Sequence, residues 1–411
     1  MKTAGIIAEF NPFHNGHAYL MQEAGRRAGA EAVVVIMSGE FVQRGTQAVM
    51  DQYLRAECAL RCGADLVLQL PVCYATASAD YFASGAVRSL QSSGLIDTLV
   101  FGCETERPEL LARAAAMDEK EEFHEALLAG LSSGLTYPAA YFSAAAAHLT
   151  EEEQTLFQPL FEEPNNLLAM AYLRSIREAG NPFETCAVRR AGDAYHQAVP
   201  ADERFHSATA LRSLLESGQI ERALEGMPDA AKSLLRSHYQ ADYPVYVSDL
   251  SGPLSWPLLR ADEASLQEIA GIGPDLAARI LNLRESYVGW DAFVRALKTR
   301  QVTQTRIQRA LLHLLLDIRE IPENPPYLRV LGVRGETGRD LLSALHTQAT
   351  VPIVTSLSEA RQRFRAQGNE SALHLLQKEL DAGALYRYLV RERYGTALPT
   401  EYHHGMLFID D

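Results

Sequence analysis

The stretch AEFNPFHNGHAYL, residues 8–20, lies where an apolar run ends and a helical pattern begins. The run GIIAEF at 5–10 is typical of a buried strand, and the apolar spacing from residue 16 to 29 is typical of an amphipathic helix. A strand that passes through a short turn into a helix is the start of a βαβ unit. The stretch therefore predicts an α/β fold, and it sets two histidines, His14 and His17, at the first turn.

The same alternation continues through the first hundred residues. Further apolar, β-branched runs lie at 32–37, 65–71 and 97–102, and helical patterns lie between them at 50–63 and 78–93. We expect a Rossmann-like parallel sheet that helices cover on both faces. In such sheets ligands bind beyond the carboxyl ends of the strands. The site is therefore expected in the loops at 9–17, 38–47, 71–78 and 102–106.

The remainder of the chain changes character. Residues 107–230 are mainly helical in pattern, and a stretch rich in Pro, Ser and Tyr at 241–257 precedes helices with a basic face. Near the end, YLRVLGV and VPIVTS flank a helical segment at 337–347, which predicts a small α/β unit near 327–356. We expect two domains, one at 1–235 that holds the parallel sheet and a mainly helical one at 236–411.

The composition bounds the class of protein. Of the 411 residues 47% are apolar, and the formal net charge is −14, which argues against a broadly basic surface but leaves room for a local basic patch. The five cysteines lack CxxC spacing and a histidine at zinc-ligand distance, so we expect reduced thiols and no protein metal site. No apolar run approaches the roughly 20 residues that cross a bilayer, and the first residues form no charged and apolar leader. We expect a soluble, cytoplasmic protein without a membrane partner.

The histidine pair has two interpretations. If the helix begins near Asn15 or Gly16, its unpaired amides point into the ligand crevice, where His14 and His17 can donate hydrogen bonds to one phosphate. Gly16 would let that phosphate approach the backbone. The alternative is a helix cap with two solvated histidines. The position at a first strand-to-helix turn favours the phosphate site.

A second anion site is expected in HSATALRSLLESG, residues 206–218. Ser207 or Thr209 caps a helix there, and Arg212 falls about one turn further on. An HxGH string followed some 190 residues later by SxTxxR resembles the HIGH-type nucleotidyltransferase superfamily. Members of that superfamily bind ATP and direct a nucleophile onto its α-phosphate.

Eight ordered segments resemble one family within that superfamily, the tRNA(Met) cytidine acetate ligases. They are GIIAEFNPFHNGHAYL, SGEFVQRG, RAECALRCGADLVLQLP, FGCE, PNNLLAMAY, VRRAGDAYH, HSATALR and KTRQVTQTRIQRALLHLLL. The resemblance implies that acetate and ATP form acetyl-adenylate and pyrophosphate. The acetyl group then passes to the N4 amino group of the wobble cytidine of elongator tRNA(Met). Residues 1–235 would be the ATP-binding domain and 236–411 the tRNA-binding domain.

The resemblance and the two motifs together name the site residues. His14 and His17 would act in catalysis, with Mg²⁺ entering through the nucleotide. The expected ATP contacts are Ile7, Phe13, His14, Asn15, Gly16, His17, Leu20, Gly102, Asn165, Asn166, Arg190, Ser207, Thr209 and Arg212. Either Asn165 or Asn166 could instead cap the following helix. Arg44 and Arg190 are candidates for phosphate or acetate contacts, and the alternative for each is a surface or inter-segment ion pair.

The chain also departs from the family pattern. Thr46 and Gln47 replace an acidic residue and a proline, Gln52 replaces a lysine, and Gln69 replaces an acid. KTRQVT stands where the family tends to have KTKRYT. These departures leave room for a divergent paralogue with an altered grip on its substrates.

The RNA-binding prediction rests on a local reversal of charge. Residues 279–309 include seven basic and two acidic residues, so this segment has a formal charge of +5 in a chain of net charge −14. Such a local reversal of charge is typical of a surface that contacts nucleic-acid phosphates. The expected RNA contacts are Arg279, Arg295, Lys298, Arg300, Arg306 and Arg309. IAGIGPDLAARIL at 269–281 also resembles a helix-hairpin-helix turn, whose glycine amides meet a backbone phosphate. The alternative is a solvated helical face with a tight turn.

Three classes of function therefore remain in the sequence. The first is the acetate–tRNA ligase. The second is a small-molecule adenylyltransferase of the same superfamily, which needs no basic C-terminal half. The third is a non-catalytic, nucleotide-responsive RNA-binding protein.

Overall fold

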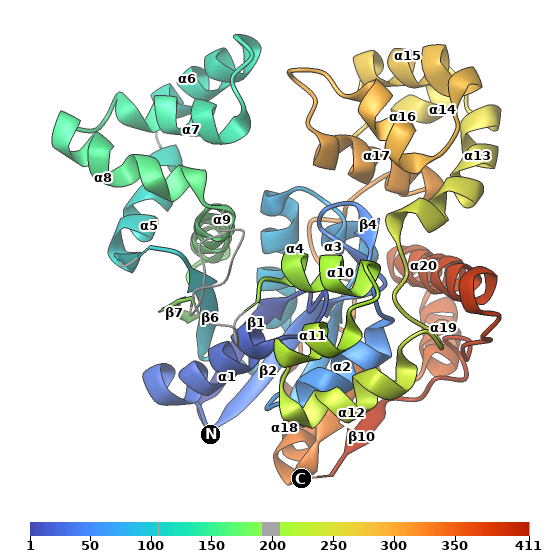
Figure 1. The fold of residues 1–411 in the computed structure, drawn as a ribbon. Coiled ribbons are helices and arrows are strands. Elements are labelled where there is room, and N and C mark those ends of the chain that lie inside the picture. Colours follow the sequence, from blue (N-terminus) through green and yellow to red (C-terminus); the bar gives the residue numbers. More distant parts are fainter. Residues whose placement is uncertain (106, 120, 191–205, 411) are drawn as a thin grey trace.

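The computed structural model describes residues 1–105, 107–119, 121–190 and 206–410. Within these ranges eight strands form one sheet in the order β10-β8-β5-β2-β1-β6-β7, with β9 paired to β8 (Figure 1). Its strands are β1 Thr3–Ala8, β2 Ala32–Ser38, β5 Leu66–Leu70, β6 Thr98–Cys103, β7 Glu184–Arg189, β8 Leu328–Arg334, β9 Ile353–Val354 and β10 Leu407–Ile409. A small antiparallel hairpin, β3 Phe41–Val42 and β4 Thr46–Gln47, follows β2.

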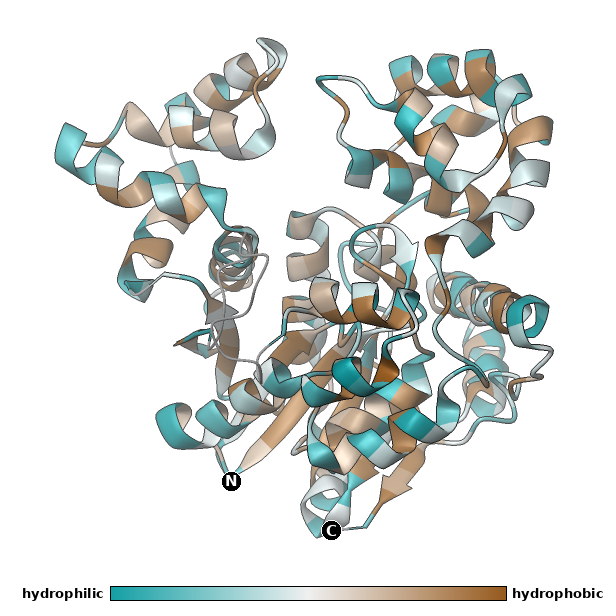
Figure 2. Cartoon of the chain, in the orientation of Figure 1, coloured by the Kyte–Doolittle hydropathy of each residue, from teal (hydrophilic) through white to brown (hydrophobic). Residues whose placement is uncertain are grey.

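The five strands of the Rossmann-like part are mutually parallel. In chain order they lie 3-2-1-4-5 across the sheet, which is the doubly wound arrangement. Alternate residues of β2 pack into different cores, Val33 and Val35 on one face and Val34 and Ile36 on the other. The apolar strands at the centre of Figure 2 reflect this burial on both faces. The predicted α/β fold class is confirmed.

Helices cover both faces of the sheet. One face carries α1 Asn15–Ala28, α2 Gln52–Arg61, α10 Ala208–Glu216, α11 Ile220–Glu225 and α12 Asp229–His238. The other carries α3 Val72–Ala75, α4 Ala79–Ser93, α9 Pro164–Glu178, α18 Gly335–Gln348, α19 Leu357–Gln367 and α20 Glu370–Tyr394.

Two helical lobes project from the same side of the sheet (Figure 1). The first lobe consists of α5 Pro108–Ala115, α6 Glu121–Ser132, α7 Tyr137–Ala146 and α8 Glu151–Glu162. The second consists of α13 Ser251–Arg260, α14 Glu263–Gln267, α15 Pro274–Leu283, α16 Trp290–Leu297 and α17 Gln304–Leu316. Short 3₁₀ helices lie at Met117–Glu119, Val247–Leu250 and Arg284–Ser286.

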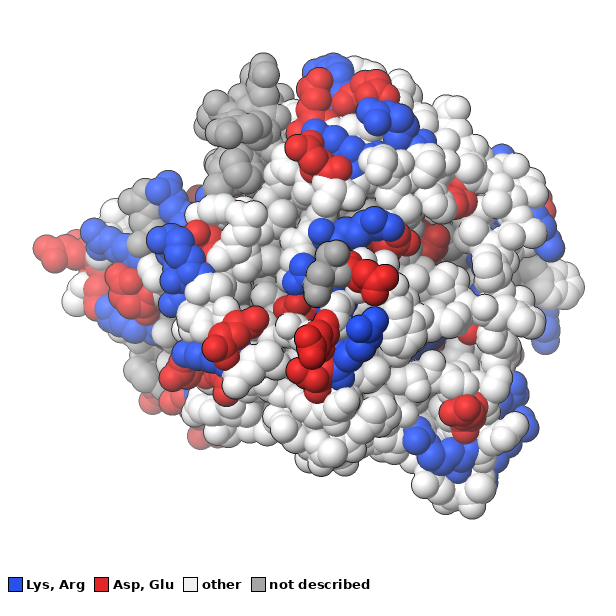
Figure 3. All heavy atoms as spheres, turned by 90° about the horizontal axis from the view of Figure 1, so that it is seen from below, with Lys and Arg blue, Asp and Glu red and all other residues white. Residues whose placement is uncertain are grey.

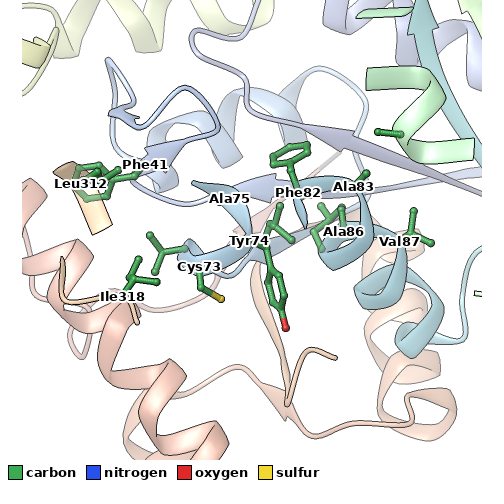
Figure 4. Close-up of a cluster of buried hydrophobic side chains, with 14 of the residues drawn as sticks. Phe41, Cys73, Tyr74, Ala75, Phe82, Ala83, Ala86, Val87, Leu312 and Ile318 are labelled. Carbon is green, nitrogen blue, oxygen red and sulfur yellow. The ribbon is translucent and has the colours of Figure 1, made fainter. Parts of the chain in front are cut away.

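Side chains from the end of the second lobe pack onto the sheet domain. Leu312 of α17 lies against Phe41, and Ile318 lies near Cys73 (Figure 4). The Thr76 hydroxyl and the Nε2 of His313 are 3.0 Å apart. The lobe is therefore fixed to the loops that follow β2 and β5.

The strands predicted near 327–356 are present, but they do not form a sheet of their own. β8 pairs antiparallel with β5, for example Leu66 with Val333, and β9 and β10 both pair parallel with β8. β8, α18 and β9 thus form a small α/β unit near 327–356, and this unit is joined to the first sheet through β8. Periodicity identifies a strand but not its partner, so the sequence pattern could not place β8 in the first sheet. The domain division near residue 235 stays a prediction.

None of the five cysteines forms a disulfide. No helix within the described part of the chain is long and apolar enough to span a membrane.

Candidate active site

A cavity of about 590 Å³ opens at the carboxyl ends of β1 and β6. β1 pairs with β2 at six positions but with β6 only at Ala4 and Gly5, so β1 and β6 separate toward their carboxyl ends. This is the point where the strand order reverses, the usual ligand crevice of a doubly wound sheet. Loop 38–47 contributes Gln43 and Arg44, and loop 9–17 contributes its histidines, as the strand pattern predicts.

The two histidines cap α1 and face the cavity at the same time. The Nδ1 of His14 accepts a hydrogen bond from the amide of Gly16 at 3.0 Å, and the Nδ1 of His17 accepts one from the amide of His14 at 3.2 Å. Because each Nδ1 is an acceptor, each neutral ring carries its proton on Nε2. The rings stack with centroids 3.7 Å apart, and both residues line the cavity. Capping is therefore real, but His14 is only 3% exposed and is not a solvated cap.

Both imidazoles are held neutral. Burial lowers the pKa of His14 to about 3, helped by the positive charges of Arg190 and Arg212 and by His206. Burial also holds the pKa of His17 well below its ordinary value, with His14 and Arg190 adding to the effect. A neutral imidazole with its proton on Nε2 is a hydrogen-bond donor that adds no net charge.

Gly16 leaves space for the imidazole ring of His14. A Cβ at this position would lie 2.9 Å from Cε1 of His14 and 3.0 Å from its Nδ1. The absence of a side chain thus makes room for the imidazole ring, in addition to any ligand.

Residues of the second motif, HSATALR at 206–212, contact the loop that carries His14 and His17. Ser207 is the N-cap of α10 and accepts from the amide of Ala210 at 3.2 Å. Arg212 donates to the carbonyl of Asn11 at 2.7 Å and to the Thr209 hydroxyl at 3.0 Å. Two segments about 200 residues apart thus share one cavity, as the sequence predicts. What they bind stays a prediction.

Gly102, just before the loop that follows β6, and residues of α9 form another wall. Arg190 lies over Gly102, where an added Cβ would be 3.4 Å from the Cγ of Arg190. Asn165 lines the cavity and donates to the Glu104 carboxylate. The Oδ1 of Asn166 accepts from the amide of Glu104 at 2.9 Å.

The idea that one of the two asparagines caps α9 is wrong. The N-cap residue is Glu163, and it makes no side-chain cap. The Asn166 side chain is 2% exposed and bonds to the backbone of the loop after β6, so it holds that loop in place. A tertiary partner in the loop after β6 overrides the local capping preference.

Of the other predicted ATP contacts, Ile7 and Leu20 line the cavity. Phe13 does not: it is fully buried against Phe10, with ring centroids 4.8 Å apart. The amide of Asn15 donates to the carbonyl of Gly226 at 3.0 Å. Both residues therefore shape the turn from outside the cavity lining.

Several lining residues are not identified by sequence reasoning. Glu9 lies within the first motif, but nothing in the pattern marks the end of β1 as its functional position. Phe82 and Tyr172 are buried aromatic side chains that resemble ordinary core. The charge pattern assigns Arg309 to RNA binding, yet this residue lines the cavity because α17 docks on the hairpin after β2. A Cβ on Gly45, where φ is 73°, would lie 2.3 Å from the backbone nitrogen of Arg309.

Arg55 is a further residue that the sequence pattern does not single out. It is fully buried and donates to the carbonyls of Glu9 at 2.6 Å and Ser38 at 3.0 Å. It thereby ties together the carboxyl ends of β1 and β2, which border the cavity.

The departures from the family pattern lie outside the cavity lining. Gln47 donates to the carbonyl of Val245 at 3.1 Å. Gln52 lies 3.3 Å from a Glu401 oxygen, and Gln69 accepts from Arg329 at 2.9 Å. Both of these glutamines belong to a buried polar network that attaches the C-terminal segment to the sheet.

The predicted RNA-contacting residues fall into three groups. Arg295, Lys298, Arg300 and Arg306 are exposed on the second lobe. Arg279 is engaged within the lobe, donating to the carbonyls of Ala296 and Leu297 at 3.1 Å, and Arg309 lines the cavity. The face seen from below in Figure 3 carries both signs of charge interspersed.

No cluster of three or more His, Cys, Asp or Glu side chains suited to a metal occurs in the part of the chain that the structure describes. The charged lining of the cavity instead suits an anion. Among the described residues it contains five arginines (44, 189, 190, 212 and 309) and three histidines (14, 17 and 206) against a single carboxylate, Glu9.

A doubly wound sheet with the HxGH histidine pair and the SxTxxR helix at its switch point defines a nucleotidyl transferase of the HIGH class. The family model described as HIGH Nucleotidyl Transferase matches residues 1–398. A tRNA(Met) cytidine acetate ligase from Syntrophotalea carbinolica is 35% identical over 94% of this chain and 94% of its own length. One from Halothermothrix orenii is 30% identical over 97% of this chain and 96% of its own length. The chain belongs to the tRNA(Met) cytidine acetate ligase family.

Solved structures agree with this assignment. Thermotoga maritima TmcAL bound with alpha-thio ATP is 28% identical and superposes with a TM-score of 0.89 over the whole of both chains. The apo form of the same protein gives a TM-score of 0.90 at the same identity and coverage.

Proposed function

We propose that this protein is an ATP-dependent ligase that acetylates the N4 amino group of the wobble cytidine of elongator tRNA(Met). Acetate is first activated as acetyl-adenylate, and the acetyl group then passes to the base. The observation that carries the proposal is the meeting of Arg212 with the loop that presents His14 and His17, in one cavity. The names of the relatives supply the substrates. With tRNA as its substrate, we expect the protein to act in the cytoplasm.

The first step needs positioning and charge stabilisation rather than covalent catalysis. The acetate carboxylate attacks the α-phosphate, and negative charge moves toward the departing pyrophosphate. The Nε2–H groups of His14 and His17 donate to the α-phosphate. Arg212, with the Ser207 and Thr209 hydroxyls at the start of α10, holds the pyrophosphate. Mg²⁺ bound with the nucleotide would neutralise part of the phosphate charge, and Glu9 is the one carboxylate among the described lining residues that could contact it.

The tRNA contacts lie on the second lobe. Arg295, Lys298, Arg300 and Arg306 are exposed there, and exposed cations bind phosphates in a salt-dependent way. The same lobe contributes Arg309 and Thr305 to the cavity. An RNA bound to the lobe therefore has a short path to the activated acetyl group.

The test is nucleoside mass spectrometry of tRNA(Met) after incubation with the pure protein, ATP and labelled acetate. We expect labelled N4-acetylcytidine together with AMP and pyrophosphate. A stable adenylylated small molecule without acetylated tRNA would indicate a small-molecule adenylyltransferase. Nucleotide and RNA binding without turnover would indicate a non-catalytic protein.

A further inference from the structure

Glu9 is an unusual group for its surroundings. It is the single carboxylate among the described residues that line the cavity, where five arginines are also found. No ion pair of Glu9 occurs within the part of the chain that the structure describes. A carboxylate at this place repels the phosphates and the acetate that the cavity is proposed to hold. Its presence therefore needs a reason other than binding an anion.

The backbone around Glu9 is firmly held. Its Oε1 accepts from the amide of Gln43 at 2.8 Å, and its carbonyl accepts from the buried Arg55 at 2.6 Å. Phe10, which follows, has a left-handed φ of 50°, and its side chain is buried in the core. The carboxylate is thus fixed at the end of β1, while one hydrogen bond leaves most of its acceptor capacity open to the cavity.

Next to Glu9 the cavity has an aromatic wall. Phe82, Phe101 and Tyr172 line it and are each at most 5% exposed. The ring of Phe82 points away from that of Tyr74 (Figure 4). The Tyr172 hydroxyl makes no hydrogen bond with any described residue, and the negative charge of Glu9 adds to the effect of burial in raising its pKa. A flat ligand with an N–H donor matches this wall.

We propose that Glu9 receives the exocyclic amino group of the acceptor cytosine and takes its proton during acetyl transfer. This inference rests on the proposed function. Carboxylates accept hydrogen bonds from the N4 amino group of cytosine, and unstacked bases commonly lie against aromatic rings. Thr305 and Arg309 of α17 also line the cavity, and α17 belongs to the lobe that is proposed to hold the RNA.

The transfer step balances without a further reactant. N4 of cytosine attacks the carbonyl carbon of acetyl-adenylate, and the bond from that carbon to the AMP oxygen breaks. The N4 proton passes to a Glu9 oxygen and then to solvent, and AMP leaves as an anion. Positioned general bases of this kind accelerate reactions by roughly a hundredfold to ten-thousandfold.

Glu9→Gln is a well-matched substitution, because the amide oxygen of glutamine can still accept from the Gln43 amide while the proton acceptor is lost. The two half-reactions are measured separately on the full-length protein. Acetate-dependent exchange of labelled pyrophosphate into ATP reports the first. Single-turnover transfer of labelled acetyl to tRNA(Met) reports the second. Glu336→Gln, the same change at an exposed position on α18, is the control.

For Glu9→Gln we expect pyrophosphate exchange close to the wild-type rate and acetyl transfer slowed by about a hundredfold or more. Transfer at the wild-type rate would overturn the inference. Equal loss of both half-reactions in a folded variant would also overturn it, and rescue of that loss by Mn²⁺ would make Glu9 a metal contact instead. If the wild-type protein shows no acetate-dependent exchange, the proposed function fails, independently of Glu9.

Discussion

The cavity and the basic surface of the second lobe both carry positive charge, but they are built differently. In the cavity, His14 and Arg212 come from distant segments, make defined hydrogen bonds and are at least partly buried. On the lobe, Arg300 and Arg306 lie close together in sequence and are exposed to solvent. Desolvated, preorganised donors act strongly on a developing charge, whereas exposed cations act mainly through screened attraction. We therefore expect large, specific effects from changes in the cavity and modest, salt-dependent effects from changes on the lobe.

The sharpest test of this comparison is His14. His14→Ala removes both the N-cap and the Nε2–H donor, and we expect pyrophosphate exchange to fall by roughly a hundredfold to a thousandfold. His14→Asn separates the two roles, because asparagine can cap the helix but cannot place a donor where Nε2 lies. A similar loss in His14→Asn, with the melting temperature kept, supports the donor role. Recovery of activity in His14→Asn would reduce the histidine to a cap.

The second test uses pH. His14 has a pKa of about 3 in the folded protein against 6.5 for the free side chain, so between these values only the unfolded chain binds the proton. Stability contributed by the neutral histidine is thus full above pH 6.5 and is lost as pH falls below it. The loss amounts to about 2 kcal/mol from pH 8 to pH 5.

The measurement is the free energy of unfolding from denaturant titrations at both pH values. Subtracting the same difference for His14→Asn removes the contributions of groups that do not interact with His14, so the remainder reports His14 together with its coupling to His17. A His14 exposed enough to titrate normally would give equal pH dependence in the two proteins.

The features of the cavity also differ in how well the sequence predicts them. The strand-to-helix turn at His14 is predictable because strand, turn and helix are local and the motif fixes their order. The convergence of Arg212 on that turn follows from motif spacing, a signal that spans the chain. The position of Arg309 depends on how α17 docks against Gly45, and helical periodicity carries no information about docking partners. The capping prediction for Asn165 and Asn166 fails for a related reason, since a loop backbone competes for Asn166.

The lobe gives the third prediction. Arg300→Ala combined with Arg306→Ala should weaken tRNA binding and reduce the slope of log affinity against log salt by about one for each phosphate that is no longer bound. Pyrophosphate exchange without tRNA should stay unchanged, because neither residue lines the cavity. Arg309→Ala is the contrasting variant, and it should affect both measurements. An unchanged salt slope in the double variant would mean that Arg300 and Arg306 do not contact tRNA phosphates and that the RNA binds at another surface.

The smallest effect on activity is expected at the departures from the family pattern. Gln52 and Gln69 approach the same point, since a Cβ on Gly39 would lie 3.2 Å from the Oε1 of Gln52 and 2.6 Å from the Nε2 of Gln69. A lysine and an acid at these positions would form a buried ion pair, and this chain has two neutral amides instead. A paired replacement of both charges keeps the local balance, so we expect the two departures to compensate each other.

Restoring the pair tests that interpretation. Gln69→Glu alone sets a carboxylate beside Glu379, whose pKa burial already raises to about 7, so we expect a loss of unfolding free energy. Adding Gln52→Lys should recover part of it, with a coupling energy of about 0.5–3 kcal/mol in a double-mutant cycle. Pyrophosphate exchange should be unaffected in Gln69→Glu, in Gln52→Lys and in the double variant, because neither position lines the cavity. A gain or loss of activity in the folded double variant would show that positions 52 and 69 influence the cavity. The buried network and the cavity would then not be independent.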